Sequence, residues 1–147
     1  MDKTKLYFMD DNAPKPNKPN HVGACVVLSY NEKILLEKRV DSDKWALIGG
    51  GLRIDESIEA CMVREIFEET GLSVDEAELC FRNLYSEPSR IIHYPDGNIV
   101  RIITIVFLLK WNSEHQLVCS EESSELRYFG HEELYHFGYC GNSQAHH

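Results

Sequence analysis

The chain has 147 residues and a net charge of −9, with 43% apolar and 27% charged residues. This balance is typical of an ordinary globular protein, and the length suits one domain with a single core. The negative charge disfavours a surface that binds nucleic acid through its phosphates. A small phosphorylated substrate stays compatible with it, because bound divalent cations can invert the charge of a local site.

The N-terminal sequence carries no targeting signal that we can identify. Its first twenty residues hold no apolar run long enough for a signal peptide, and no segment reaches the roughly 20 apolar residues that span a bilayer. We therefore expect a cytoplasmic protein with no membrane partner. Residues 13–20 alternate proline with polar residues and are expected to be extended. We divide the chain into an N-terminal extension (1–20), one domain (21–140) and a tail (141–147).

The cysteines favour neither a disulfide framework nor a zinc site, because their number is odd, their spacing is wide and no CxxC pair occurs. The five cysteines are Cys25, Cys61, Cys80, Cys119 and Cys140, and we expect most of them to be small core residues.

The first half of the domain has the pattern of a β-hairpin followed by a third strand. Residues 21–30 and 33–39 are rich in β-branched and aliphatic side chains and are separated by only two residues. Residues 45–48 form a short third strand that runs into three glycines, Gly49 to Gly51. These glycines suit either a tight strand-to-helix turn with positive φ or a close approach of the backbone to a metal or phosphate.

One helix is predicted after the glycines, from about residue 56 to 70. Asp55 or Ser57 can cap its N-terminus, and Gly71 suits the left-handed position that follows the last turn.

The second half of the domain is predicted to complete a sheet. Residues 78–87 and 98–111 read as strands joined across the turn sequence of residues 94–98. The second strand is apolar on both faces, so it should lie in the centre of the sheet. A last strand at 125–129 and a short helix within 131–137 follow. Strands on both sides of one helix indicate an α+β fold, in which helices pack on a mixed sheet.

The predicted helix gathers carboxylates on one face. Glu65, Glu68 and Glu69 stand at i, i+3 and i+4, where each like-charge pair costs roughly 0.2–0.5 kcal/mol, and only Arg64 offers an opposite charge. The opposite face carries apolar side chains that we expect to be buried: Ala60, Val63 and Phe67.

The glutamates have two readings. A solvated stripe is the common one for a charge run, but it would more readily include lysines. Three hard oxygen ligands on one helix face are instead what Mg²⁺ or Mn²⁺ prefers.

A longer motif favours the metal reading. Gly50 is followed after five residues by Glu56 and after seven more by REIFEETGL at residues 64–72. This spacing matches GX5EX7REUXEEXGU, with U aliphatic, so the chain resembles the Nudix hydrolase family. The resemblance implies an α/β/α sandwich with a central mixed sheet. It also implies divalent-metal-dependent hydrolysis of a nucleoside diphosphate linked to another moiety.

The same resemblance implies roles for individual residues. Glu65, Glu68, Glu69 and the carbonyl of Gly50 would hold Mg²⁺, or Mn²⁺ in its place. Glu56 and Arg64 would orient this catalytic cluster.

Water would displace a phosphate oxygen in this reaction, so a general base is required. Within the motif Glu68 or Glu69 could serve, and outside it Glu122 or Glu125 lies where some family members carry a late glutamate.

Residues outside the acidic set are candidates for holding the substrate. Cationic side chains and unhindered backbone suit phosphates, and aromatic rings suit a nucleobase. The phosphate candidates are Arg39 and Arg53 with Gly50 and Gly51, then Arg90 and Arg101. The aromatic candidates are Tyr85, Tyr94 and Phe129, although packing in the core or at its rim is the more common role for each. Trp45 is expected to pack beneath the motif's loop.

Two departures from the family pattern occur, IGGG in place of Pro-Gly-Gly and Asp55-Glu56 in place of Gly-Glu. Neither replaces a metal ligand, so we expect a shifted loop with the chemistry kept. Pro88, sixteen residues past the motif, resembles the ADP-ribose-cleaving members, whereas the short chain favours nucleoside triphosphates. Homodimers are common in the family. Two further readings stay open, a Nudix-fold binding or regulatory domain without turnover and an acidic interaction domain without metal.

Overall fold

A computed structural model describes residues 4–111 and 117–136. The predicted tail and Cys140 lie outside these residues. The elements in chain order are β1 (Lys5–Leu6), β2 (His21–Tyr30), β3 (Lys33–Arg39), β4 (Trp45–Gly51), α1 (Ile58–Thr70), the 3-10 helix η1 (Glu76–Glu78), β5 (Cys80–Tyr85), β6 (Ile91–His93), β7 (Ile99–Lys110), β8 (Ser123–Phe129) and α2 (His131–His136).

The strands form one mixed sheet in the order β1-β6-β7-β2-β4-β3-β8. The strand β5 is outside this order and pairs with a different part of β7 than β6 does. The pairing of β2 with β7 is parallel and the other pairings are antiparallel. The prediction that 98–111 contains a central strand is confirmed, because β7 pairs with β2 on one side and with β5 and β6 on the other.

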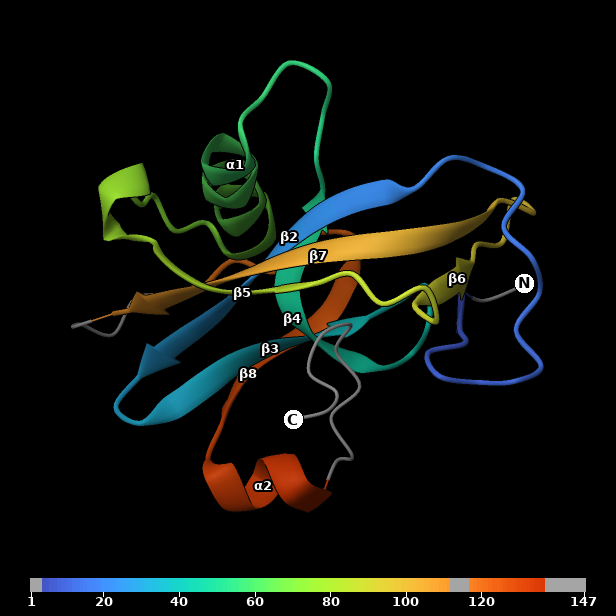
Figure 1. Ribbon diagram of the computed structural model, residues 1–147. Helices are drawn as coiled ribbons and strands as arrows, with labels where there is room; N and C mark the ends of the chain where they lie inside the picture. The colour runs from blue at the N-terminus through green and yellow to red at the C-terminus, as the bar shows by residue number, and fades with distance from the viewer. Residues whose placement is uncertain (1–3, 112–116, 137–147) are drawn as a thin grey trace.

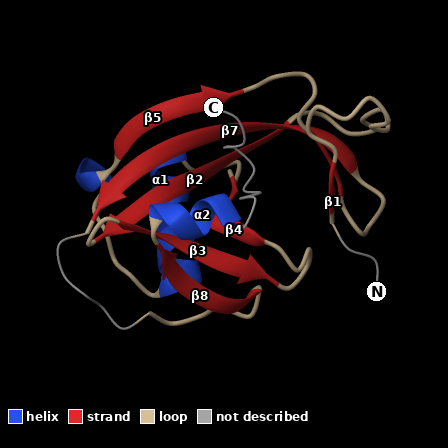
Figure 2. Ribbon diagram, turned by 90° about the horizontal axis from the view of Figure 1, so that it is seen from below, coloured by secondary structure: helices blue, strands red, loops and turns tan. Residues whose placement is uncertain are grey.

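Helices cover both faces of this sheet (Figure 1), which confirms the predicted sandwich. On one face, Met62 and Ile66 of α1 pack into the larger core cluster with Val26 and Leu35. On the other face, Leu134 of the short α2 packs against a second cluster around Phe129. Figure 2 shows the sheet between the two helices, with α2 in front and α1 behind. No helix of the described residues is long and apolar enough to cross a bilayer.

The three glycines differ from the predicted turn. They belong to β4 and pair with Gly23, Ala24 and Cys25 of β2, and none has a positive φ. The chain turns only after them, and α1 then starts at its cap Ser57, whose Oγ accepts the amide of Ala60 at 3.1 Å. Gly71 ends the helix at φ 81°, as predicted. The strand β6 was not anticipated.

The predicted buried face of α1 is wrong. Phe67 is 56% exposed, and Ala60 and Val63 are only half-buried, whereas Glu65 and Glu69 are 8% and 1% exposed. The side of the helix that faces the sheet carries Met62 and Ile66 as well, and its buried carboxylates have polar partners. Glu65 pairs with Arg64 of the same helix, and Glu69 with Ser120 and Ser123. Glu68 alone points to solvent, with a side chain that is 44% exposed.

The cysteine prediction holds for two of the four described residues. Cys25 and Cys61 are buried, and Cys80 and Cys119 are exposed; all four are free thiols.

Candidate active site

Arg64 is the centre of the acidic cluster. Its Nε and Nη2 donate to the two oxygens of Glu56 at 2.9 and 2.7 Å, and its Nη1 donates to Glu65 Oε2 at 2.7 Å and to Glu68 Oε1 at 3.1 Å. Nη2 also donates to the carbonyl of Gly51 at 3.0 Å. One guanidinium therefore links the end of β4, the following loop and α1, as the resemblance implied for an orienting residue.

The environment of each carboxyl group differs. The hydrogen bonds from Arg64 lower the pKa of Glu56 to about 2, so that this carboxylate is ionised in all ordinary conditions. Burial raises the pKa of Glu65 above its usual range. Glu68 is open to solvent and lies 3.7 Å from Nη2 of Arg53.

Glu69 enters a second polar cluster behind the first. Its Oε2 accepts hydrogen bonds from the hydroxyls of Ser120 and Ser123, both at 3.3 Å. Ser123 Oγ is also in a short hydrogen bond to Glu37 Oε1, and the carboxyl groups of Glu37 and Glu69 are in contact. Burial and the contact with Glu69 raise the pKa of Glu37 to about 9.

Gly50 lies directly beneath the cluster. A Cβ built on it would collide with the carboxylate of Glu65, closer than real Cβ contacts come. The absence of a side chain therefore lets the backbone of β4 approach Glu65 of α1. The approach to a metal or phosphate that we considered for these glycines stays a prediction.

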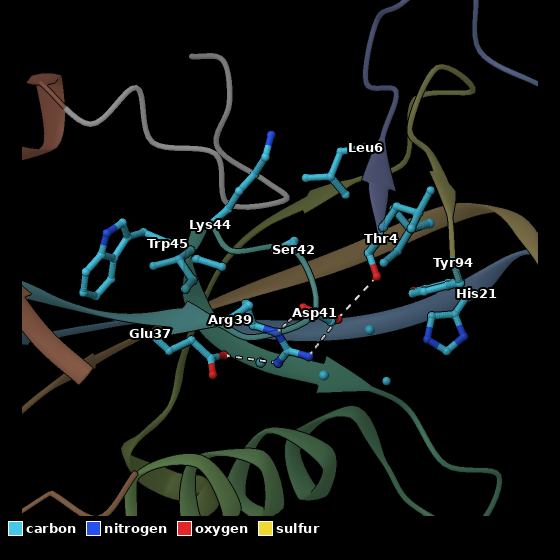
Figure 3. Close-up of a pocket in the computed structure, with 18 of the residues that line it drawn as sticks. Thr4, Leu6, His21, Glu37, Arg39, Asp41, Ser42, Lys44, Trp45 and Tyr94 are labelled. Atoms are coloured by element: carbon cyan, nitrogen blue, oxygen red, sulfur yellow. Dashed lines mark hydrogen bonds and ion pairs between the residues drawn. The ribbon is translucent and has the colours of Figure 1, made fainter. Parts of the chain in front are cut away.

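A pocket of about 170 Å³ opens beside the glycines (Figure 3). Arg39, Gly50 and Gly51 line it, as do His21 and Tyr94. Figure 3 shows the rings of His21 and Tyr94 next to each other, across the pocket from Trp45. The structure thus brings three of the six phosphate-binding candidates (Arg39, Gly50 and Gly51), and one aromatic candidate, to one cavity.

Arg39 is fixed at the pocket wall by acidic neighbours. Its Nε lies 3.2 Å from Asp41, and its Nη2 lies 3.4 Å from Glu122. Glu122 is therefore near the pocket, whereas Glu125 pairs with Arg127 at 3.2 Å.

The remaining candidates lie elsewhere. Arg53 is an exposed partner of Glu68 and does not line the pocket. Arg90 is buried, with its guanidinium over the rings of Phe8 and Tyr85.

Two aromatic side chains meet in the same place. Phe129 is fully buried, so it has the core-packing role and is not available for stacking on a base. Trp45 packs edge-on against it at 4.9 Å between ring centroids, on the face of the sheet opposite α1, and not beneath the motif's loop.

Sequence reasoning missed Glu37 and Ser123. The available signal was an acidic residue inside the apolar run KILLEKR of β3, where a fully buried charge needs a partner.

The donor set fits a divalent cation in its chemistry, since carboxylates and the carbonyl of Gly50 are hard oxygen ligands. Within residues 4–111 and 117–136, no three acidic, histidine or cysteine side chains converge closely enough to hold an ion as they stand. Nη1 of Arg64 bridges Glu65 and Glu68, and Glu69 accepts from Ser120 and Ser123. A cation must therefore compete with this guanidinium.

Comparison with known proteins agrees with this geometry. A model of the NUDIX domain family matches residues 19–144. The chain belongs to the Nudix family. Among curated Nudix relatives, a MutT-like protein of Streptomyces ambofaciens is 41% identical over 76 residues, which are 50% of this chain and 49% of the relative. An RNA pyrophosphohydrolase of Psychromonas ingrahamii is 28% identical over 117 residues, 76% of this chain and 62% of the relative. The chain spans less than two thirds of each.

A solved Nudix structure shares the fold and shows a ligand. It is a bifunctional NMN adenylyltransferase/ADP ribose pyrophosphatase from Francisella tularensis, in complex with AMP and a Mn ion. The two structures superpose with a TM-score of 0.63 at 25% sequence identity, over 84% of this chain and 38% of the other.

Proposed function

We propose that this Nudix protein is a divalent-cation-dependent hydrolase that cleaves a phosphoric anhydride bond in a nucleoside diphosphate linked to another group. The observation that carries the proposal is the position of the Arg64-centred carboxylates, which border Gly50 at the edge of a pocket containing Arg39. Membership of the Nudix family, with relatives named as pyrophosphohydrolases, supports it.

Glu65, Glu68, Glu69 and the carbonyl of Gly50 would hold Mg²⁺ or Mn²⁺. The bound cation would neutralise phosphate oxygens and lower the pKa of the attacking water. The AMP and Mn ion in the Francisella structure support this ligand class.

The chain's own residues would remove the proton, position the carboxylates and bind the substrate. Glu68 is the accessible carboxylate among Glu65, Glu68 and Glu69, so we assign to it the removal of the proton from water. Arg64 and Glu56 keep Glu65 in position. Arg39 faces the substrate phosphates from the pocket wall, and Tyr94 is placed to contact the nucleoside.

The geometry does not choose between ADP-ribose and a nucleoside triphosphate. Pro88 is exposed in the loop between β5 and β6 and does not line the pocket. Turnover should therefore be assayed on a panel of substrates that contains both classes, together with dinucleoside polyphosphates, NADH, nucleotide sugars and a 5′-triphosphorylated RNA.

The test compares Glu68→Gln with the wild type under steady-state turnover in Mg²⁺ and in Mn²⁺. Loss of the charged group should lower kcat by about a hundredfold or more, with an unchanged thermal midpoint. Glu59→Gln is the matched control, because Glu59 is exposed in the first turn of the same helix and outside the cluster. Near-normal turnover in Glu68→Gln would defeat the assignment. Tight nucleotide binding by a wild type without turnover would instead indicate a regulatory domain.

A further inference from the structure

We propose that Glu37 of β3 is an additional carboxylate ligand of the divalent-cation site, sharing a cation with Glu69. This inference rests on the proposed function, but it concerns a residue outside the Nudix motif and on a different element. It adds a strand-borne ligand to the helix-borne set.

Glu37 is unusual in its burial. Its side chain is 0% exposed, and its Oε2 has no hydrogen-bond donor within the described residues. The nearby cationic group is Nη1 of Arg39, at 3.6 Å. Figure 3 shows the Glu37 side chain reaching toward Arg39 on the side of the sheet where α1 lies. A buried carboxylate oxygen without a donor is costly, so in the absence of a cation the group is stabilised by holding a proton, and a cation that binds here would take the place of that proton.

The contact with Glu69 adds to this shortage of hydrogen-bond donors. The two carboxyl groups touch, and the hydroxyl of Ser123 is within hydrogen-bond distance of both. A serine hydroxyl has one proton and can donate to one acceptor at a time. Ser120 supplies a further donor to Glu69 only. The pair therefore has fewer donors than acceptor oxygens.

A divalent cation is the occupant that suits this place. Two carboxylates in contact are hard oxygen ligands, and their mutual repulsion is relieved when a doubly charged ion lies between them. Glu69 already belongs to the set that would hold a cation. Glu37 also lines the pocket that contains Arg39 and Gly50, so an ion at this position would lie beside the substrate phosphates.

The experiment counts bound Mn²⁺ from the loss of the free-ion electron paramagnetic resonance signal. It uses the full chain, without substrate. Glu37→Gln keeps the shape of the side chain and removes its charge, so we expect one fewer bound ion or an affinity about tenfold weaker. Glu32→Gln is the matched control, since Glu32 is exposed in the turn of the same hairpin. Wild-type stoichiometry and affinity in Glu37→Gln would overturn the proposal.

Thermal unfolding with and without Mn²⁺ separates ligation from a structural role. If Glu37 is a ligand, Mn²⁺ should raise the Tm of Glu37→Gln by less than it raises that of the wild type. In chelator, the Tm of the variant should be at or above that of the wild type. A variant that is destabilised equally in both conditions would contradict ligation.

A wild-type crystal soaked in Mn²⁺ keeps the test decisive should Glu37→Gln fail to fold. An anomalous peak about 2–2.5 Å from a Glu37 oxygen supports the proposal, and a peak at Glu65 and Glu68 alone overturns it. If the wild type hydrolyses nucleotides and binds Mn²⁺ independently of Glu37, only this inference fails. If the wild type binds no Mn²⁺, the proposed function fails as well.

Discussion

At the residue scale, Arg64 explains how an acidic helix face is stable without a bound cation. The like-charge pairs among Glu65, Glu68 and Glu69 oppose the helix, but one guanidinium donates to two of these carboxylates and to Glu56. The same arginine is anchored on the carbonyl of Gly51, so the cluster is tied to the strand beneath it. Arg64 therefore fixes the position of the acidic groups as well as their charge balance.

Substitution of Gly50 and of Gly49 by alanine should separate a site effect from a folding effect. In Gly50→Ala the three atoms nearest to the new methyl group all belong to the flexible end of Glu65, so we expect a folded protein in which kcat falls by about a hundredfold. In Gly49→Ala it meets the backbone of Ala24 and the Cα of Cys25 at 2.8 Å, so we expect a loss of about 1–3 kcal/mol or more in unfolding free energy. Urea unfolding and turnover check both. An active, stable Gly50→Ala would show that Glu65 has room to move.

Glu37 should make the stability of the metal-free protein depend on pH. Burial and Glu69 raise its pKa in the folded protein to about 9, from an ordinary value of 4.5. Between these values the unfolded chain is ionised and the folded protein holds a proton. The free energy of unfolding therefore falls as the pH rises from 5 to 9, by no more than about 1.4 kcal/mol per pH unit.

The measurement is urea unfolding in chelator at several pH values, with Glu37→Gln for comparison. The wild type should lose stability relative to the variant as the pH rises. Parallel curves for the two proteins would mean that Glu37 is ionised in the folded state as well.

At the scale of the element, α1 shows which parts of the structure were predictable. Its existence, its cap Ser57 and its end at Gly71 follow from local chemistry and were predicted. Its orientation was not, because Glu69 is buried against Ser120 and Ser123, about fifty residues later in the chain. That Gly49 to Gly51 pair with β2 was likewise not predicted, because neither of the two readings of these glycines extended the strand through them. Local patterns thus locate elements, whereas the burial of charge depends on distant partners.

The corrected helix orientation gives a prediction for two adjacent residues. Ile66 is fully buried in the main core cluster, and Phe67 is 56% exposed. Ile66→Ala should cost about 2–5 kcal/mol of unfolding free energy. Phe67→Ala should cost less than about 1 kcal/mol, although phenylalanine is the larger side chain. Chemical denaturation of both variants checks this, and the reverse order of the two losses would show that α1 is turned the other way.

At the scale of the whole molecule, the N-terminal segment completes the pocket. Thr4 and Leu6 line the cavity, and β1 pairs with β6 at the edge of the sheet. The hydroxyl of Thr4 donates to Asp41, the same side chain that accepts from Arg39. Sequence reasoning treated residues 1–20 as an extension, because a strand of two residues carries no recognisable pattern. The pocket therefore depends on a contact between chain segments that no local motif encodes.

Removal of residues 1–9 should consequently raise KM and leave kcat nearly unchanged. The deletion takes away one pocket wall, but β1 pairs with β6 alone, and Arg90 keeps its hydrogen bonds to Ile102 and Thr104 after Phe8 is lost. The hydrogen bonds that hold the acidic cluster together do not involve this N-terminal segment. A pure binding effect, about fivefold in KM, is therefore expected in steady-state kinetics. Lys5→Ala is the control, since Lys5 is exposed on the same strand. A fall in kcat with unchanged KM would mean that the segment supports the catalytic cluster itself.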